Sequence, residues 1–100
     1  MSASSVHVDH RPADHRFVAD VAGGEAVLIY EPLPGGDLDL EHTVVPEEAR
    51  GGGVGDALVR AAVAYARREG VHLVPTCPYV EAWRARHPKD GDVFAADGAE

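Results

Sequence analysis

Three successive stretches of the N-terminal half have the pattern of β-strands. The first and third alternate between apolar and polar residues with period two, which is typical of half-buried strands, and the second is a continuous apolar run from Ala26 to Tyr30, which is typical of a more deeply buried strand. The stretches cover residues 16–21, 25–31 and 37–45. A Gly-Gly pair at 23–24 separates the first from the second, and a segment rich in proline and glycine at 32–36 separates the second from the third. Short connections of this composition are turns. The pattern therefore predicts an antiparallel meander of three strands.

Strict alternation gives the third stretch one mainly apolar face and one mainly polar face. The apolar face comprises Leu38, Leu40, His42 and Val44, and the polar face comprises Asp39, Glu41, Thr43 and Val45. We therefore expect His42 among apolar neighbours and Glu41 on the opposite side of the sheet.

The period then changes to that of a helix over residues 53–69, where one face is apolar. Its members are Val54, Ala57, Leu58, Ala61, Ala62 and Tyr65. Gly70 suits the position after the helix, and residues 71–74 predict a fourth strand, parallel to the third after a right-handed crossover. A second helix follows at 79–87, with Pro78 at its first position and Cys77 as its N-cap. These elements predict an α/β (α+β) fold: a meander that continues through a helix crossover to a parallel strand, with two main helices.

Both ends of the chain are polar. We expect a flexible N-terminal arm at 1–14, one folded domain at 15–90 and a polar C-terminal tail at 91–100, in which only Val93 and Phe94 are large and apolar. The arm contains several histidines and aspartates, but they lack a recognised metal-ligand spacing, so no metal site is expected.

Composition narrows the functional classes. The formal net charge of −8 disfavours nucleic acid and anionic membranes as partners, and it is compatible with a cationic or amine substrate. A single cysteine, the absence of a membrane-length apolar run and the absence of a hydrophobic signal region predict a cytoplasmic protein. We expect a monomer or a weak dimer.

The candidate chemistry begins between the third strand and the first helix, in the sequence Arg50-Gly51-Gly52-Gly53-Val54-Gly55. Glycines let a ligand approach the backbone closely, and unpaired N–H groups at a helix start attract anions. The loop lacks the Gly-Lys-Ser/Thr ending of a Walker motif and the third glycine of a dinucleotide fingerprint. A different phosphate-bearing ligand is therefore expected here, unless the loop is only a flexible connection.

The pattern Arg-x-x-Gly-x-Gly resembles the coenzyme A pyrophosphate loop of the GNAT acyltransferase superfamily. Its flanks, LDLEHTVVP before the loop and PTCPY after the next strand, resemble a minimal single-domain branch of that superfamily. In that branch a His-Thr-x-Val-Pro strand end precedes the loop, and a cysteine follows the strand after the helix. The resemblance covers residues 25–88.

This resemblance implies an acetyl-CoA-dependent N-acetyltransferase that acts on an unidentified primary amine, on a small molecule or a protein, by direct attack on the thioester. It implies that the pyrophosphate of coenzyme A (CoA) lies on Arg50–Gly55 and that the pantetheine follows the backbone of Thr43, Val44 and Val45. The alternative is a non-catalytic acyl-CoA-binding or interaction module. Larger relatives add helices between the first two strands, where this chain has about two glycines, so its acceptor side should be shallow.

Four side chains are candidates for catalysis. Histidine titrates near neutral pH, so His42 is a candidate base, and the alternative is a histidine packed in the sheet. Glu41 could act through water, as carboxylates do in larger relatives, or be a solvated strand residue. Cys77 could protonate the leaving sulfur, contact the cofactor, carry an acetyl group or simply fill space. Tyr79 could donate its hydroxyl to the thiolate, or pack beside Trp83.

Overall fold

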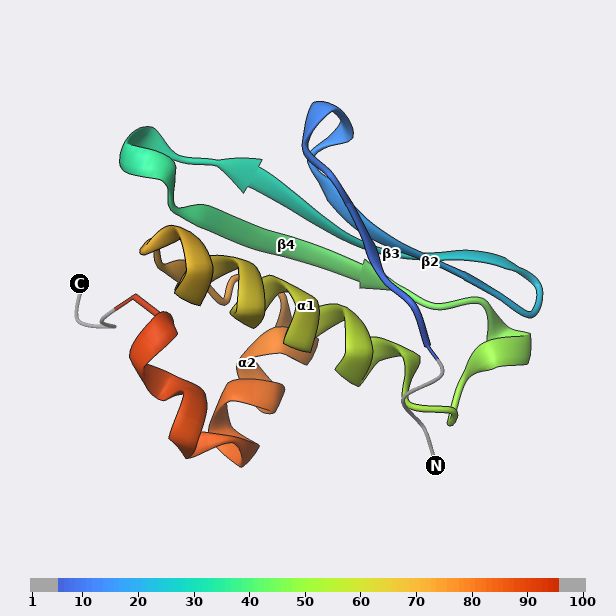
Figure 1. Ribbon diagram of the computed structural model, residues 1–100. Helices are drawn as coiled ribbons and strands as arrows, with labels where there is room; N and C mark the ends of the chain where they lie inside the picture. The colour runs from blue at the N-terminus through green and yellow to red at the C-terminus, as the bar shows by residue number, and fades with distance from the viewer. Residues whose placement is uncertain (1–5, 96–100) are drawn as a thin grey trace.

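Five strands form one curled sheet in the order β1-β2-β3-β4-β5, and two helices, α1 and α2, pack on the same side of it (Figure 1). This arrangement is seen in a computed structural model that describes residues 6–95. The strands are β1 (Asp9–Arg11), β2 (Arg16–Val21), β3 (Gly24–Pro32), β4 (Leu38–Val44) and β5 (Leu73–Val74). Strands β1 to β4 are antiparallel neighbours, whereas β4 and β5 are parallel. The predicted fold class is confirmed.

Helix α1 (Val54–Glu69) is the crossover between the two parallel strands. Gly70 ends it in the left-handed conformation, with φ 71°, and its N–H donates to the carbonyl of Ala66. The buried face is rotated slightly from the predicted one: Val59, Val63 and Ala66 are buried, while Ala61 and Tyr65 are only partly buried. Helix α2 (Pro78–Arg86) begins at the expected proline, and the two helices and the sheet enclose a single apolar core.

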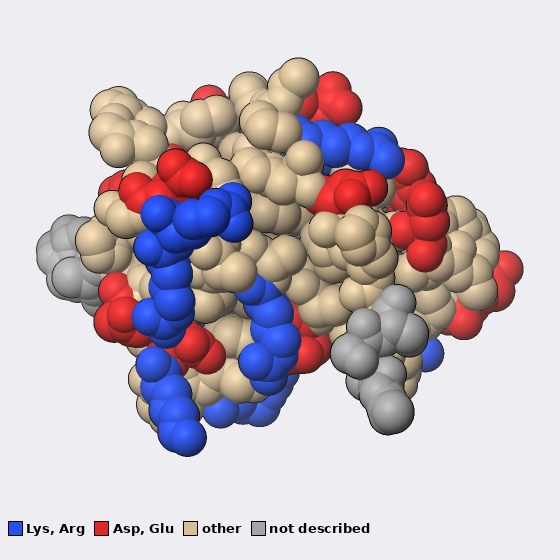
Figure 2. Space-filling view, viewed as in Figure 1, with Lys and Arg blue, Asp and Glu red and all other residues tan. Residues whose placement is uncertain are grey.

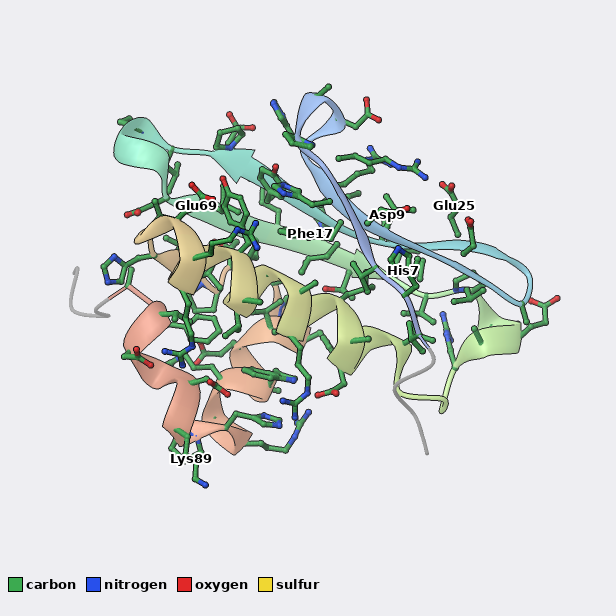
Figure 3. The ribbon with its side chains drawn as sticks, in the orientation of Figure 1. His7, Asp9, Phe17, Glu25, Glu69 and Lys89 are labelled. Atoms are coloured by element: carbon green, nitrogen blue, oxygen red, sulfur yellow. The ribbon has the colours of Figure 1, made fainter. Side chains whose placement is uncertain are left out.

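Large side chains from every layer meet in this core. Phe17 of β2 lies between the sheet and α1 (Figure 3), and Leu58 of α1 and Trp83 of α2 are fully buried with it. Removal of that apolar surface from water is the main force that holds the helices against the sheet.

The expectation of a flexible arm over residues 1–14 is wrong for Asp9–Arg11, which pair with β2 as β1. The reason is His10, whose ring stacks on Phe17 with centroids 4.3 Å apart and whose Nε2 atom lies 2.6 Å from the hydroxyl of Tyr30. Histidine counts as a polar residue in a hydrophobic pattern, so the pattern does not predict that its ring packs against aromatic side chains. Residues 1–5 lie outside the described part of the chain.

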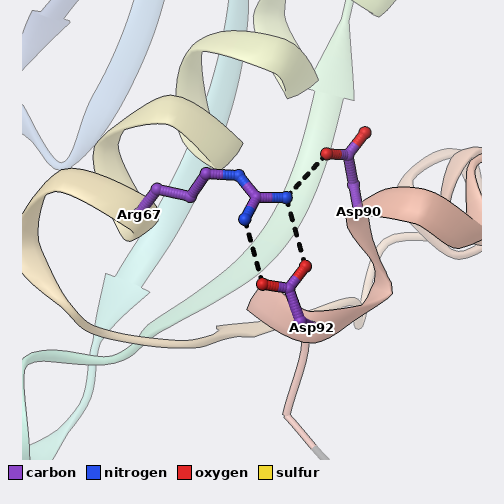
Figure 4. A network of polar contacts seen from close by, with 3 residues as sticks. All are labelled: Arg67, Asp90 and Asp92. Carbon is purple, nitrogen blue, oxygen red and sulfur yellow. Dashed lines mark hydrogen bonds and ion pairs between the residues drawn. The ribbon is translucent and has the colours of Figure 1, made fainter.

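The expectation of a separate tail from residue 91 is also wrong as far as residue 95. Val93 and Phe94 are buried, and the N–H of Ala95 donates to the carbonyl of Leu73 at 2.8 Å. Arg67 of α1 holds this segment through bonds of 2.8 Å to Asp90 and 2.9 Å to Asp92 (Figure 4). Two apolar residues and one arginine are enough to dock the segment. Residues 96–100 lie outside the described part.

A β-bulge interrupts the pairing of β3 with β4. Leu40 lies opposite Tyr30 and His42 lies opposite Ile29, so Glu41 is an extra residue without a cross-strand partner. The predicted alternation is therefore wrong beyond Leu40. His42 and Val44 are exposed, and His42 does not share the buried face of Leu38 and Leu40.

Candidate functional site

The site begins where β4 and β5 separate. The two strands pair only at Leu38 with Leu73 and at Asp39 with Val74. One further bond follows, from the N–H of Cys77 to the carbonyl of Leu40 at 2.8 Å. Beyond it β4 continues while the other chain turns into α2, so the side of β4 that faces away from β3 is left open.

Backbone groups of β4 face this opening. The N–H of Tyr30 donates to the carbonyl of His15 on the β2 side, at 3.0 Å. Alternate residues of an antiparallel strand direct their backbone groups to opposite neighbours, so Ile29 directs its groups to β4. Its partner His42 directs its own groups back to β3, and Thr43 therefore directs its N–H and carbonyl away from β3, into the opening.

The glycine loop lies beside the open end of β4. The side chain of Arg50 is held there, because its Nε donates to the carbonyl of Val45 at 3.2 Å. Gly51 and Gly53 have φ of 86° and 82°, in the left-handed region that favours glycine. A Cβ atom at either position would meet nothing within 4 Å, so both glycines border open space. Within residues 6–95, no backbone carbonyl accepts from the N–H groups of residues 51–56.

Strand end and loop together line a groove of about 430 Å³. The residues that line it are Thr43, Val45, Ala49, Arg50, Gly51, Gly53, Val54, Gly55 and Tyr79. The structure thus brings together most of the predicted cofactor-binding residues. It does not bring Val44 into the groove, since that side chain is 53% exposed on the other face of β4, and Gly52 and Cys77 do not line it.

Cys77 lies at the N-cap of α2 and is only 5% exposed. Its sulfur is 3.5 Å from the hydroxyl oxygen of Thr43, which does line the groove. Burial raises the pKa of the thiol, but the Thr43 hydroxyl and the backbone N–H groups of Val80, Tyr79 and Thr43 outweigh burial and lower the pKa below its ordinary value. The sulfur makes no capping hydrogen bond within α2, so the helix N–H groups act as nearby dipoles.

Tyr79, in the first turn of α2, reaches across to the start of α1. A Cβ atom at Gly55 would lie 2.7 Å from the Tyr79 hydroxyl oxygen, so only glycine leaves room for this ring. Burial and the Asp56 carboxylate raise the pKa of the phenol, although Arg86 opposes them. Within residues 6–95, no hydrogen bond joins the hydroxyl to Cys77.

Sequence reasoning did not foresee all the contacts of Asp56, beside the loop, because only its bond to Arg60 could be expected from helical spacing. A carboxylate in the first turn of α1 would repel a bound anion. Here one carboxylate oxygen accepts from Trp83 Nε1 and the other accepts from Arg60 Nε, each at 2.8 Å. Burial raises the pKa of Asp56, but these two hydrogen bonds outweigh burial and lower it. The carboxylate is thus engaged with cationic and polar donors.

Most arginines of the helical face are likewise engaged. Figure 2 shows acidic side chains interspersed with Lys and Arg on this face, and ion pairs join Arg60 to Asp56, Arg67 to Asp90 and Arg84 to Glu81. The loop residue Arg50 forms no ion pair within residues 6–95. Positive potential at the groove therefore comes from Arg50 and from the N-terminus of α1.

Besides Cys77, two more of the predicted catalytic residues lie outside the groove. His42 is exposed on β4 opposite Ile29, and Glu41 is half-buried at the bulge. Both immediately precede Thr43 in the chain, so they lie near the point where the strands separate, but neither side chain lines the space beside the loop.

A sequence model described as GCN5-related N-acetyl-transferase matches residues 16–93, a span that contains the separated strands, the loop and both helices. The chain belongs to this family. The resemblance inferred from the loop and its flanks is confirmed. Among residues 6–95, none of this GCN5-related protein's helices combines the length and apolar character needed to cross a membrane.

Curated relatives share most of their length with this member of the family. Protein NATD1 of Xenopus tropicalis is 32% identical over 88 residues, which cover 86% of this chain and 81% of that protein. Protein NATD1 of Bos taurus and of Homo sapiens are each 31% identical over 85 residues, which cover 83% of this chain and 75% of each relative. The similarity therefore extends well beyond the loop.

Proposed function

We propose that this protein binds acetyl-CoA in the groove between β4 and α2 and transfers the acetyl group to a primary amine. The observation that carries the proposal is that one groove joins the open backbone of β4 to the glycine loop at the start of α1. A pantetheine arm carries amide groups that can pair with a strand edge, and a pyrophosphate suits a helix N-terminus. CoA combines these two features.

The residues present fit the cofactor. Thr43 offers backbone donors and acceptors, Gly51 and Gly53 border open space, and Arg50 supplies a cation beside unpaired N–H groups. Bound acetyl-CoA supplies an activated acetyl thioester. The chain's own task is to hold that thioester, admit the amine and manage protons.

For the proton transfers we propose His42 or Glu41 as the group that deprotonates the amine, since the two residues immediately precede Thr43, where the strands separate. Cys77, hydrogen-bonded to Thr43, is proposed to stabilise the departing sulfur through that hydroxyl. The amine attacks the thioester directly, and the burial of Cys77 argues against its acting as a nucleophile.

Thermal unfolding with and without acetyl-CoA tests binding, and release of free CoA with a panel of primary amines tests transfer. Binding stabilises the native state and raises the melting temperature. A melting temperature that is unchanged by millimolar acetyl-CoA would disprove the proposal.

The second candidate function is acyl-CoA binding without catalysis. It is favoured by the tight turn at Ala22–Gly23 between β2 and β3, which leaves no inserted element beside β4 to enclose an acceptor. Binding of acetyl-CoA without CoA release in the presence of any amine of the panel would select this candidate.

A further inference from the structure

The hydroxyl of Tyr79 is a polar group at the groove. The side chain is 38% exposed and lines the groove, and within residues 6–95 no hydrogen bond to its oxygen is found. It reaches the start of α1 because Gly55 has no side chain: a Cβ atom there would lie 2.7 Å from the hydroxyl oxygen and 2.8 Å from the ring carbon that bears it.

This position brings the hydroxyl close to a free backbone donor. In any residue the backbone nitrogen lies about 2.5 Å from the Cβ position. Since the hydroxyl oxygen is 2.7 Å from the Cβ position of Gly55, it lies within about 5.2 Å of the Gly55 nitrogen. An oxygen that accepts two hydrogen bonds of about 2.8 Å can join donors up to about 5.6 Å apart. One anionic oxygen can therefore accept from Tyr79 and from Gly55 together.

The surroundings favour donation by this hydroxyl. Burial and the neighbouring carboxylate of Asp56 raise the phenol pKa, so the group keeps its proton. Within residues 6–95, the hydroxyl forms no hydrogen bond with this carboxylate, whose oxygens accept from Trp83 and Arg60. The Cys77 sulfur already has the Thr43 hydroxyl as a neighbour and does not require a second one.

Building on the proposed function, we infer that Tyr79 binds the pyrophosphate of CoA together with the loop, rather than protonating the departing thiolate. The tyrosine then determines cofactor specificity, because it distinguishes a donor that carries a pyrophosphate from one that carries only the pantetheine arm. Gly55 serves the same purpose indirectly, since it makes room for the ring.

The test compares Tyr79→Phe with the unaltered protein in calorimetric titrations with CoA and with dephospho-CoA, which lacks only the 3′-phosphate. Binding of pantetheine is measured by its competition with CoA. We expect Tyr79→Phe to bind CoA and dephospho-CoA each about tenfold more weakly, as for loss of a hydrogen bond to a charged group. Pantetheine should behave identically with both proteins. Tyr65→Phe is the matched control, because Tyr65 lies on α1 about 15 Å from Gly55 along the helix, and it should bind all three ligands unchanged.

Each other outcome overturns the inference in a distinguishable way. Equal CoA affinity in Tyr79→Phe would mean that the hydroxyl touches no phosphate. A loss seen with pantetheine as well would place it on the arm, and a loss confined to CoA would place it on the 3′-phosphate. If the unaltered protein fails to bind CoA at all, the proposed function fails first and the role of Tyr79 fails with it.

Discussion

Gly53 allows the conformational cost of a substitution to be separated from its effect on the ligand. It is the N-cap of α1 with φ 82°, and Gly70 is the C-cap of the same helix with φ 71°. A Cβ atom at either position meets nothing within 4 Å, so alanine introduces backbone strain but no collision. The left-handed conformation costs a residue with a side chain about 1–2 kcal/mol. We therefore expect Gly53→Ala and Gly70→Ala to lose about the same stability.

The two variants should differ when CoA is added. At a concentration 100 times Kd, binding stabilises the native state by about 2.7 kcal/mol. If the Gly53 methyl group obstructs the pyrophosphate and weakens binding tenfold, that stabilisation falls to about 1.4 kcal/mol, whereas Gly70→Ala should keep all of it. Each kcal/mol corresponds to about 4–8 °C in the melting temperature of a domain of this size.

The assay is thermal unfolding of both variants with and without CoA, and Gly53→Asn adds an internal check. Asparagine tolerates the left-handed region, so this variant should regain stability without regaining CoA binding. Equal CoA-induced shifts in Gly53→Ala and Gly70→Ala would refute the assignment of the loop as the phosphate site. Unchanged stability in both would refute the conformational reasoning.

Three further outcomes follow from the described contacts. His42→Ala should lower turnover by about 10²-fold or more, as for loss of a general base, while CoA affinity stays constant; full turnover would leave His42 without a catalytic role. Thr43→Val removes the hydroxyl that lowers the pKa of the Cys77 thiol, whereas burial still raises that pKa. Alkylation of Cys77 should therefore require a higher pH in Thr43→Val but not in the control Thr76→Val. Burial and Arg68 lower the pKa of His10, so the unfolded chain takes up its proton at about pH 6.5 and the folded chain only at lower pH. The free energy of unfolding should therefore fall as pH falls through this window. Urea unfolding should show a smaller fall in His10→Gln than in the unaltered protein, and the same fall in the control His7→Gln as in the unaltered protein.

The parts of the fold that sequence predicts are those in which local pattern and tertiary environment agree. The alternation at 16–21 and the helical period of α1 each match a buried face, and the apolar run at 26–30 lies within β3. Gly51 and Gly53 of the loop have positive φ, which glycine favours. By contrast, β1 depends on the stacking of His10 against Phe17, and the polar character of histidine does not predict this contact. The same holds for Tyr79, whose position follows from the missing side chain of Gly55 on another helix.

The bulge at Glu41 was unpredictable because it depends on the pairing of β4 with β3, not on either strand alone. It also explains the site. A bulge bends its strand and increases its twist, and this one lies just beyond the last residues at which β4 pairs with β5. We therefore infer that the extra residue directs the end of β4 away from its parallel neighbour and opens the groove.

Deletion of Glu41 tests this explanation, because it removes the bulge without exchanging the faces of β4. Leu40 would remain opposite Tyr30 and His42 opposite Ile29, now in a regular ladder, so the core side chains would keep their partners. We expect the shortened protein to fold, with slower hydrogen exchange in β4, but to bind CoA at least tenfold more weakly, since a straighter β4 closes the space beside Thr43. Glu41→Ala is the matched control: it keeps the extra residue, and hence the bulge, and should bind CoA normally. Normal binding by the deletion variant would show that the strands separate for another reason. Equal losses in both variants would assign the effect to the Glu41 carboxylate rather than to the backbone.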